Sequence, residues 1–109
     1  MLEILFAASL VTFIKNDSFE VESCTATPFE VVKSELPKWP NDAYSTYGFT
    51  EFQVYVDESG GIISSVIKAS EPRRIFDRVS KRALSGWQFN KSKNNERCFN
   101  VKFKFQLAE

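Results

Sequence analysis

The strongest constraint in this 109-residue sequence is the alternation of apolar and polar residues near its C-terminal end. From Cys98 onward, apolar residues take every second position and polar residues fill the positions between: Phe99, Val101, Phe103, Phe105 and Leu107 against Asn100, Lys102, Lys104 and Gln106. A period of two is typical of a β-strand with one buried face and one face in water. The rest of the chain must therefore supply elements that cover the apolar face of this strand.

Two further strands are predicted upstream, joined by a tight turn. The stretch from Phe49 to Asp57 alternates in the same way, with Phe52, Val54 and Val56 on one face. Gly60 and Gly61 follow in a polar segment, and glycine readily takes the positive φ that tight turns need. The segment from Ile62 to Ala69 then predicts the second strand of an antiparallel hairpin.

The stretch from Ser70 to Phe89 predicts one amphipathic helix. Its apolar residues recur at spacings of three and four, and its charged residues fill the remaining arc: Ile75, Phe76, Val79, Ala83 and Trp87 against Arg73, Arg74, Asp77, Arg78, Lys81 and Arg82. Ser70 and Pro72 suit the start of a helix, and Gly86 suits its end. We therefore expect an α+β fold of the order β-β-α-β, in which a small antiparallel three-stranded sheet packs on one main helix.

The composition excludes several classes of function. Lysine and arginine together number 14, as do aspartate and glutamate, so no overall positive charge attracts nucleic acid. The chain contains no histidine, which removes the commonest general base and the commonest zinc ligand. We expect a single-domain, non-enzymatic protein without a metal or another cofactor.

The N-terminal region contains an uncharged stretch from Ile4 to Ile14. It is shorter than the roughly 20 apolar residues of a membrane-spanning helix, but it has the length of a signal-peptide core. Glu3 and the lack of a clear A-x-A site leave a buried segment of the fold as the alternative. We expect a signal segment at residues 1–15, an N-terminal arm at 16–35 and the folded domain at 36–109, in a periplasmic or otherwise exported protein without a membrane span.

The two cysteines, Cys24 and Cys98, are too distant for a C-x-x-C motif and too few for a metal site. Cys98 lies on the face of its strand opposite Phe99 and Phe103, and the segment around Cys24 is the element still available to cover that face. This placement predicts a disulfide if the protein matures outside the cytoplasm. Two unrelated thiols are the alternative.

A rigid, proline-flanked segment precedes the first predicted strand. Pro37 and Pro40 enclose Lys38 and Trp39 and favour an extended backbone, and Pro40 can open a short helix through Tyr44. The segment is either a strap across the sheet or a surface loop with a core tryptophan.

Several short motifs, in this order, resemble the TonB C-terminal domain family. The resemblance covers roughly Leu36 to Leu107 and depends on these stretches: Pro37-Lys38-Trp39-Pro40, Gly48, Val56-Asp57-Glu58-Ser59-Gly60, Ser70-Glu71-Pro72, Phe76-Asp77 and Trp87-Gln88-Phe89. It implies a TonB/TolA C-terminal-like fold with a short N-terminal helix.

The resemblance also implies a function and a binding site. It implies an envelope module that recruits a protein or peptide partner, a TonB-box-like segment of an outer-membrane receptor, as an added strand in TonB-dependent transport. The implied edge is the final strand, and the implied contact residues lie on the proline-flanked segment and on that strand: Leu36, Lys38, Trp39, Asn100, Lys102, Lys104 and Gln106. The alternative is a small structural or assembly protein of the envelope that forms a homodimer through the same strand.

Overall fold

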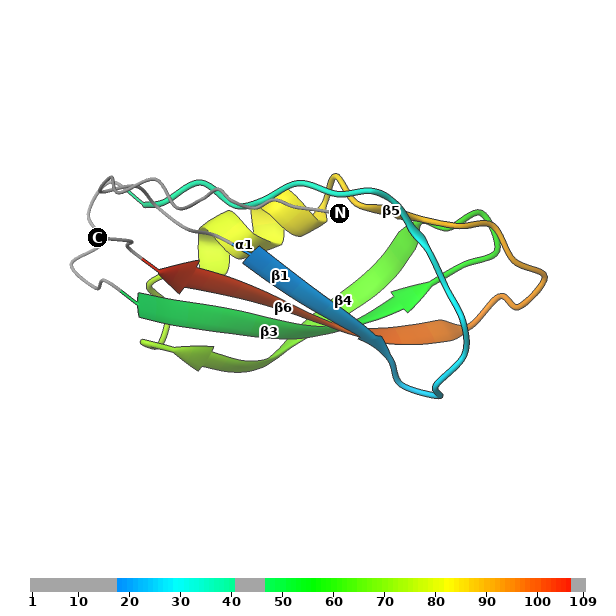
Figure 1. The fold of residues 1–109 in the computed structure, drawn as a ribbon, viewed down its shortest axis with the longest axis horizontal. Helices are drawn as coiled ribbons and strands as arrows, with labels where there is room; N and C mark the ends of the chain where they lie inside the picture. The colour runs from blue at the N-terminus through cyan, green and yellow to red at the C-terminus, as the bar shows by residue number, and fades with distance from the viewer. Residues whose placement is uncertain (1–17, 41–46, 107–109) are drawn as a thin grey trace, which may run out of the picture.

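The computed structural model describes residues 18–40 and 47–106. Six strands and one helix follow one another in this part of the chain (Figure 1): β1 (Ser18–Ser23), β2 (Val31–Lys33), β3 (Tyr47–Val56), β4 (Ile62–Glu71), α1 (Asp77–Leu84), β5 (Gln88–Phe89) and β6 (Arg97–Gln106). The predicted signal segment at residues 1–15 and the predicted short helix after Pro40 lie outside the described residues.

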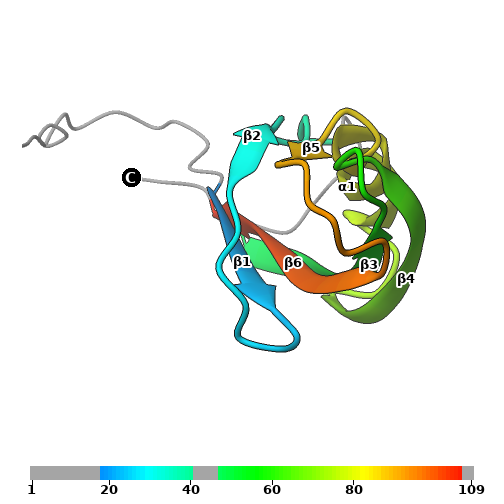
Figure 2. The ribbon, with the colours of Figure 1, turned by 90° about the vertical axis from the view of Figure 1, so that its right-hand side faces the viewer.

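The strands form two antiparallel sheets. The larger sheet has the order β1-β6-β3-β4, and the smaller one pairs β2 with β5. Figure 2 shows β1 and β4 at opposite edges of the larger sheet, with α1 and the small sheet on one of its faces. The larger sheet therefore has an inner face, which α1 and the small sheet cover, and an outer face on its other side.

The core lies between these two layers and is rich in aromatic residues. Alternate residues of β3 and β6 point inward, as the sequence predicts, and they meet residues from α1 and from the segment after it: Phe52, Val54, Val56, Phe99, Val101, Phe103 and Phe105 with Phe76, Ala83, Leu84, Trp87 and Phe89. The rings of Phe76 and Phe105 stack at 4.1 Å, and those of Phe89 and Phe99 at 4.4 Å. Burying a side chain of this size stabilises the fold by roughly 1.5–3 kcal/mol.

The predicted fold class, a three-stranded sheet packed on one main helix, is wrong. The described part of the chain consists mostly of strands, and α1 has only 8 residues. Ser70 and Glu71 do not begin the helix but end β4, where they pair with Thr50 and Phe49 of β3. Because their backbone is held in the sheet, the helix begins only after the turn at residues 72–76, and Ile75 of the predicted apolar stripe stays exposed.

The N-terminal arm supplies the strand that the predicted fold lacked. β1 pairs with β6 over six residue pairs, from Ser18 opposite Lys104 to Ser23 opposite Phe99. The predicted hairpin of β3 and β4 and the inward and outward faces of β6 are confirmed. The extra strand nevertheless changes which strands lie at the edges of the sheet.

The predicted disulfide between Cys24 and Cys98 is confirmed. The two Cα atoms lie 5.3 Å apart, and the bond joins the end of β1 to the start of β6 across a sequence separation of 74. The N–H of Cys24 also donates to the carbonyl oxygen of Cys98 at 3.0 Å. The arm is thus attached to the sheet both covalently and through its hydrogen bonds.

The turn between β3 and β4 is fastened to the smaller sheet. Gly60 has a φ of +95°, and its carbonyl oxygen accepts a hydrogen bond from the N–H of Phe89 at 2.8 Å. The buried guanidinium of Arg97 donates to the carbonyl oxygens of Asp57 at 2.9 Å and of Asn90 at 2.7 Å. These bonds fix the position of the turn that joins β3 to β4.

Candidate protein-interaction site

β4 is an open edge of the large sheet. It is hydrogen-bonded to β3 on one side and to no strand of the described chain on the other. Three of its apolar side chains are exposed, with fractions of 58% for Ile63, 58% for Val66 and 40% for Ile67. A strand edge with free main-chain N–H and C=O groups is a template on which another strand can pair.

Exposed apolar side chains line both faces of this edge. Val66 pairs with Gln53 on the outer face, and Ile67 pairs with the buried Phe52 on the inner face. The register shifts twice along β4, at Ile63 and at Lys68. An added strand could therefore make apolar contacts on both faces of the sheet, and it would lie next to Lys68.

A cationic groove lies beside the C-terminal end of β4. It has a volume of about 480 Å³, and its charged lining residues are Lys68, Glu71, Arg73, Arg74 and Asp77. Within the described part of the chain, none of the three basic residues forms an ion pair. Asp77 Oδ1 instead accepts a hydrogen bond from Thr50 Oγ1 at 3.2 Å. The groove is therefore lined by three cations and two carboxylates, and among the described residues none of the three cations is engaged in an ion pair.

A second groove lies beside the N-terminal end of β4. It also has a volume of about 480 Å³, and it runs between Ile62 and Ile63 of the strand and the last turn of α1. Buried Leu84 and Trp87 contribute to its lining, and Lys81 is its one charged lining residue. The two grooves together accompany most of the length of the open edge.

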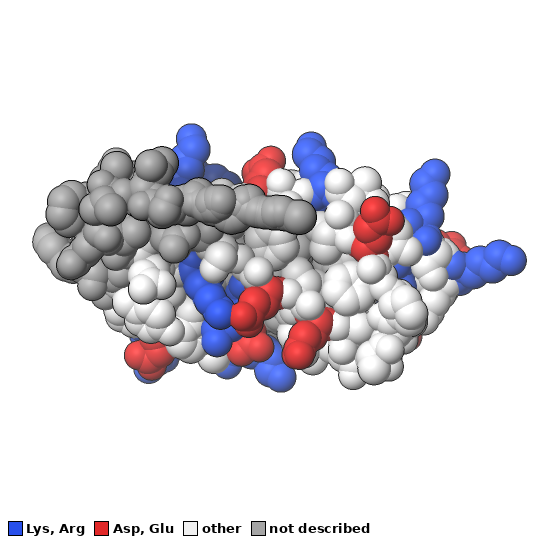
Figure 3. Space-filling model, viewed as in Figure 1, with Lys and Arg blue, Asp and Glu red and all other residues white. Residues whose placement is uncertain are grey.

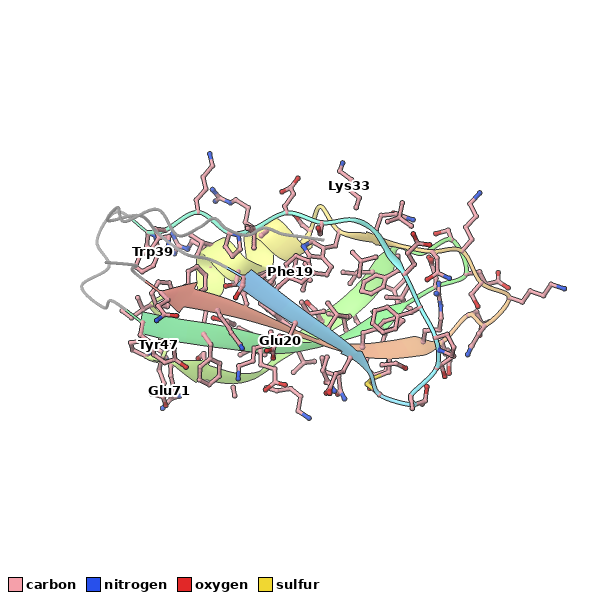
Figure 4. The ribbon with its side chains drawn as sticks, viewed as in Figure 1. Phe19, Glu20, Lys33, Trp39, Tyr47 and Glu71 are labelled. Atoms are coloured by element: carbon pink, nitrogen blue, oxygen red, sulfur yellow. A yellow bond between two sulfur atoms is a disulfide. The ribbon has the colours of Figure 1, made fainter. Side chains whose placement is uncertain are left out.

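The opposite edge of the sheet is β1, a short strand with exposed residues. The ring of Phe19 meets the ring of Trp87 edge-on, with centroids 4.8 Å apart. On the other face of β1, Glu20 pairs with Lys104. Two main effects lower the pKa of Glu20 below its ordinary value: the larger is the hydrogen bond from the Lys104 ammonium, and the second is the positive charge of that ammonium. Figure 4 labels Phe19 and Glu20 on this strand.

The predicted contact residues before β3 lie over the helical layer. Leu36 and Lys38 line a small cavity of about 150 Å³ beside α1. The ring of Trp39 lies edge-on to the rings of Phe76 at 5.4 Å and Phe105 at 5.9 Å. Trp39 thus packs against the core, as the interpretation of this segment as a loop with a core tryptophan expects.

The predicted contact residues of the final strand lie on the outer face of the sheet. Lys104 is engaged by Glu20, and the Lys102 ammonium lies 4.5 Å from the centroid of the Phe49 ring. Asn100 and Gln106 continue the same row of outward positions. Because β1 pairs with β6 as far as Lys104, the final strand is not an edge, and that part of the prediction is wrong.

The structure does not bring the predicted contact residues together. Trp39 contacts the inner layer, whereas Lys102 and Lys104 face outward from β6, so the sheet separates the two groups. That these side chains meet a partner stays a prediction. The open edge of β4 was missed, although its sequence carries a signal: Ile63, Val66 and Ile67 break the alternation and cannot all face one core.

The described residues form no candidate metal centre. They contain no group of three or more His, Cys, Asp or Glu side chains that could hold a metal ion. In the view of Figure 3, positive and negative side chains are interspersed, without a large area of one sign. Nor does the described part of the chain contain a helix long and apolar enough to cross a membrane.

No protein-family model matches this sequence, and no curated protein matches it.

Proposed function

We propose that this protein is a non-enzymatic binding module of the cell envelope that recruits an extended segment of a partner protein as an added strand beside β4. One observation carries the proposal: a ten-residue strand has one open side and exposed apolar side chains on both faces. In this mode of recognition, main-chain hydrogen bonds provide affinity and side-chain pockets provide selectivity. The two grooves beside β4 are candidates for such pockets.

The rigidity of the edge favours this mode of binding. β3 is paired on both sides, and the turn that leads into β4 is fastened through Gly60 and Arg97. A template that is already ordered loses little conformational entropy on binding, so more of the contact energy is retained as affinity. Only the partner segment then loses much conformational entropy when the complex forms.

The resemblance to the TonB C-terminal domain family supports the same class of function. It implies addition of a TonB-box-like segment of an outer-membrane receptor beside the final strand. Because β1 pairs with β6, the final strand has no free side, and we place the added strand beside β4 instead. The disulfide supports maturation in an oxidising compartment, which agrees with an exported protein.

A displayed library of random decapeptides, selected on the whole protein, tests the proposal. Selected peptides are resynthesised with a single N-methyl group at each position in turn, and their affinities are measured. Strand addition predicts that N-methylation lowers the affinity at every second position, because the N–H groups of a strand point alternately toward and away from its neighbour. In the bound state, amide exchange should slow along β4.

Two matched variants locate the binding edge. Val66 on β4 and Val32 on β2 are both strand valines, with exposed fractions of 58% and 61%. Val66→Gln, which adds no charge to the edge, should weaken binding about tenfold, the equivalent of about 1.4 kcal/mol, whereas Val32→Gln should leave it unchanged. Selected peptides that tolerate every N-methyl group and bind Val66→Gln normally would overturn the proposal.

A further inference from the structure

The charge around β4 indicates which kind of segment binds there. We infer, on the basis of the proposed strand addition, that the partner segment is acidic and that its carboxylates meet Lys68, Arg73 and Arg74 in the groove, whose lining also includes Glu71 and Asp77 and keeps a positive excess of one charge. The proposed partner is a protein with an extended segment in which acidic and apolar residues alternate.

Positive charge is concentrated in the β4–α1 region of a chain whose charges balance overall. The whole protein has a formal net charge of zero. Residues 62–86 contain six basic residues and two acidic ones, which gives this region a net charge of +4: Lys68, Arg73, Arg74, Arg78, Lys81 and Arg82 against Glu71 and Asp77. A local excess of this kind attracts an oppositely charged segment and raises its rate of association.

The three basic residues of the groove are available to a ligand. They are exposed, and within the described part of the chain none of them has an ion-pair partner that an incoming carboxylate would have to displace. Arginine presents a planar set of donors that fits a carboxylate through two parallel hydrogen bonds. Arg73 and Arg74 can therefore each hold one acidic side chain beside the edge.

The opposite edge of the same sheet already shows this pattern of recognition. There, β1 carries the sequence Phe19-Glu20-Val21-Glu22 and pairs with β6, which carries Lys102 and Lys104 on its outward face. Its apolar side chains face the core, and Glu20 forms the ion pair with Lys104. A short acidic and apolar strand thus binds a cationic strand of this protein. The β4 edge, whose positive charge comes from Lys68 and from Arg73 and Arg74 just beyond the strand, has no such partner strand among the described residues.

The charge also argues against a second copy as the occupant of this edge. Parallel pairing of two β4 strands would place their cationic C-terminal ends side by side, and like charges that face each other across a strand pair are destabilising. Antiparallel pairing would place each cationic end beside the uncharged first half of the other strand, which offers it no carboxylate. The residue at one of the two register shifts is Lys68, and irregularities and lysines are features that keep identical edges from pairing. An acidic segment from another protein avoids this repulsion.

Arg74 offers a way to separate binding from folding. Its φ of 71° lies in the left-handed region, which glycine adopts more readily than a residue with a side chain. Arg74→Gly removes the charge and relieves this strain, so the variant should fold at least as stably as the parent. A loss of binding in this variant then reflects the missing guanidinium.

The test uses three labelled decapeptides in which Val alternates with Glu, Gln or Lys, with affinity measured by fluorescence anisotropy. The Glu peptide should bind at least about tenfold more tightly than the Gln peptide, and this difference should shrink in high salt. Lys68→Gln and Arg74→Gly should each weaken binding of the Glu peptide by about two- to fivefold and leave the Gln peptide unaffected. Lys33→Gln, an exposed site far from Glu71 in Figure 4, is the control and should change neither affinity.

The outcomes distinguish this inference from the proposed function. Equal binding of the Glu and Gln peptides, both weakened by Val66→Gln, would overturn the acidic preference and leave strand addition standing. Binding of the Glu peptide that Val66→Gln does not affect would overturn both. A concentration-dependent dimer in sedimentation that Val66→Gln abolishes would assign the edge to a second copy and would also overturn the inference.

Discussion

Replacing Cys24 and Cys98 together with serine removes a covalent bond that closes a loop across a sequence separation of 74. In the chain-entropy model, closing a loop of this length restricts the unfolded chain and stabilises the fold by about 4.4 kcal/mol at 25 °C. Measured values often fall below the model, so we expect a loss of about 3–4 kcal/mol in the free energy of unfolding. For a domain of this size such a loss is a large part of the total stability.

Urea unfolding, followed by tryptophan fluorescence and by circular dichroism, measures this loss. The double variant should unfold at a lower urea concentration and with a steeper dependence on urea, because its unfolded chain is less compact and exposes more surface. The parent protein in excess reductant should match the double variant within about 0.5 kcal/mol, which controls for the serine side chains.

The same variant should lose amide protection first in β1, because this strand is mostly exposed and its end is no longer joined to β6. Protection in β3, which is paired on both sides, should persist up to global unfolding. A stability loss below about 1 kcal/mol with an unchanged urea dependence would refute the loop-closure reasoning.

Three further predictions concern the core, a close backbone approach and a turn. Trp87→Ala should lower stability by about 3–5 kcal/mol in urea unfolding because it truncates a buried ring, whereas Lys81→Ala on the exposed side of α1 should change it by no more than about 0.5 kcal/mol. Gly48→Ala should lower the melting temperature, at about 1–3 kcal/mol, because its Cβ would lie 2.3 Å from the nearest atom of the ring packed on it; an unchanged melting temperature would contradict this packing. Hydrogen bonds from the Ser59 hydroxyl and then from backbone N–H groups of the turn lower the pKa of Asp57, so its contribution to stability is present above the ordinary value of about 3.9 and is lost as the pH falls through the lowered pKa. Asp57→Asn should therefore flatten the acid side of a plot of stability against pH, and an unaltered slope would argue against this assignment.

Local sequence patterns predicted the features that depend on local geometry. The alternation in β3 and β6 identified their buried faces, because neighbouring residues of a strand point to opposite sides whatever the strand pairs with. The same alternation placed Cys98 on the face away from the core and led to its pairing with Cys24. Hydrophobic pattern and side-chain direction were sufficient for these inferences.

Features that depend on distant pairing were not predictable in this way. Ser70, Glu71 and Pro72 suit a helix start, but Ser70 and Glu71 are held in β4 by β3, and a pairing partner some 20 residues away leaves no local signal. Likewise, the predicted Cys24–Cys98 bond brings the end of β1 to the start of β6, but it does not indicate that the two segments pair as strands. That pairing covers the free side of β6, whereas β4 stays open, so the broken alternation in β4 was a signal that gained its meaning only with the strand order known.

The Cys24–Cys98 bond also determines how the protein responds to mechanical load. Ser18 lies opposite Lys104, so tension applied between the segment that enters β1 and the segment that leaves β6 pulls on neighbouring ends of two paired strands. The hydrogen bonds between these strands would open one after another from that end, until the tension reaches the disulfide next to Ser23 and Phe99. From there the covalent bond carries the load directly from one strand to the other. The residues between the two cysteines, including β4 and the whole hairpin, then lie outside the path of the force.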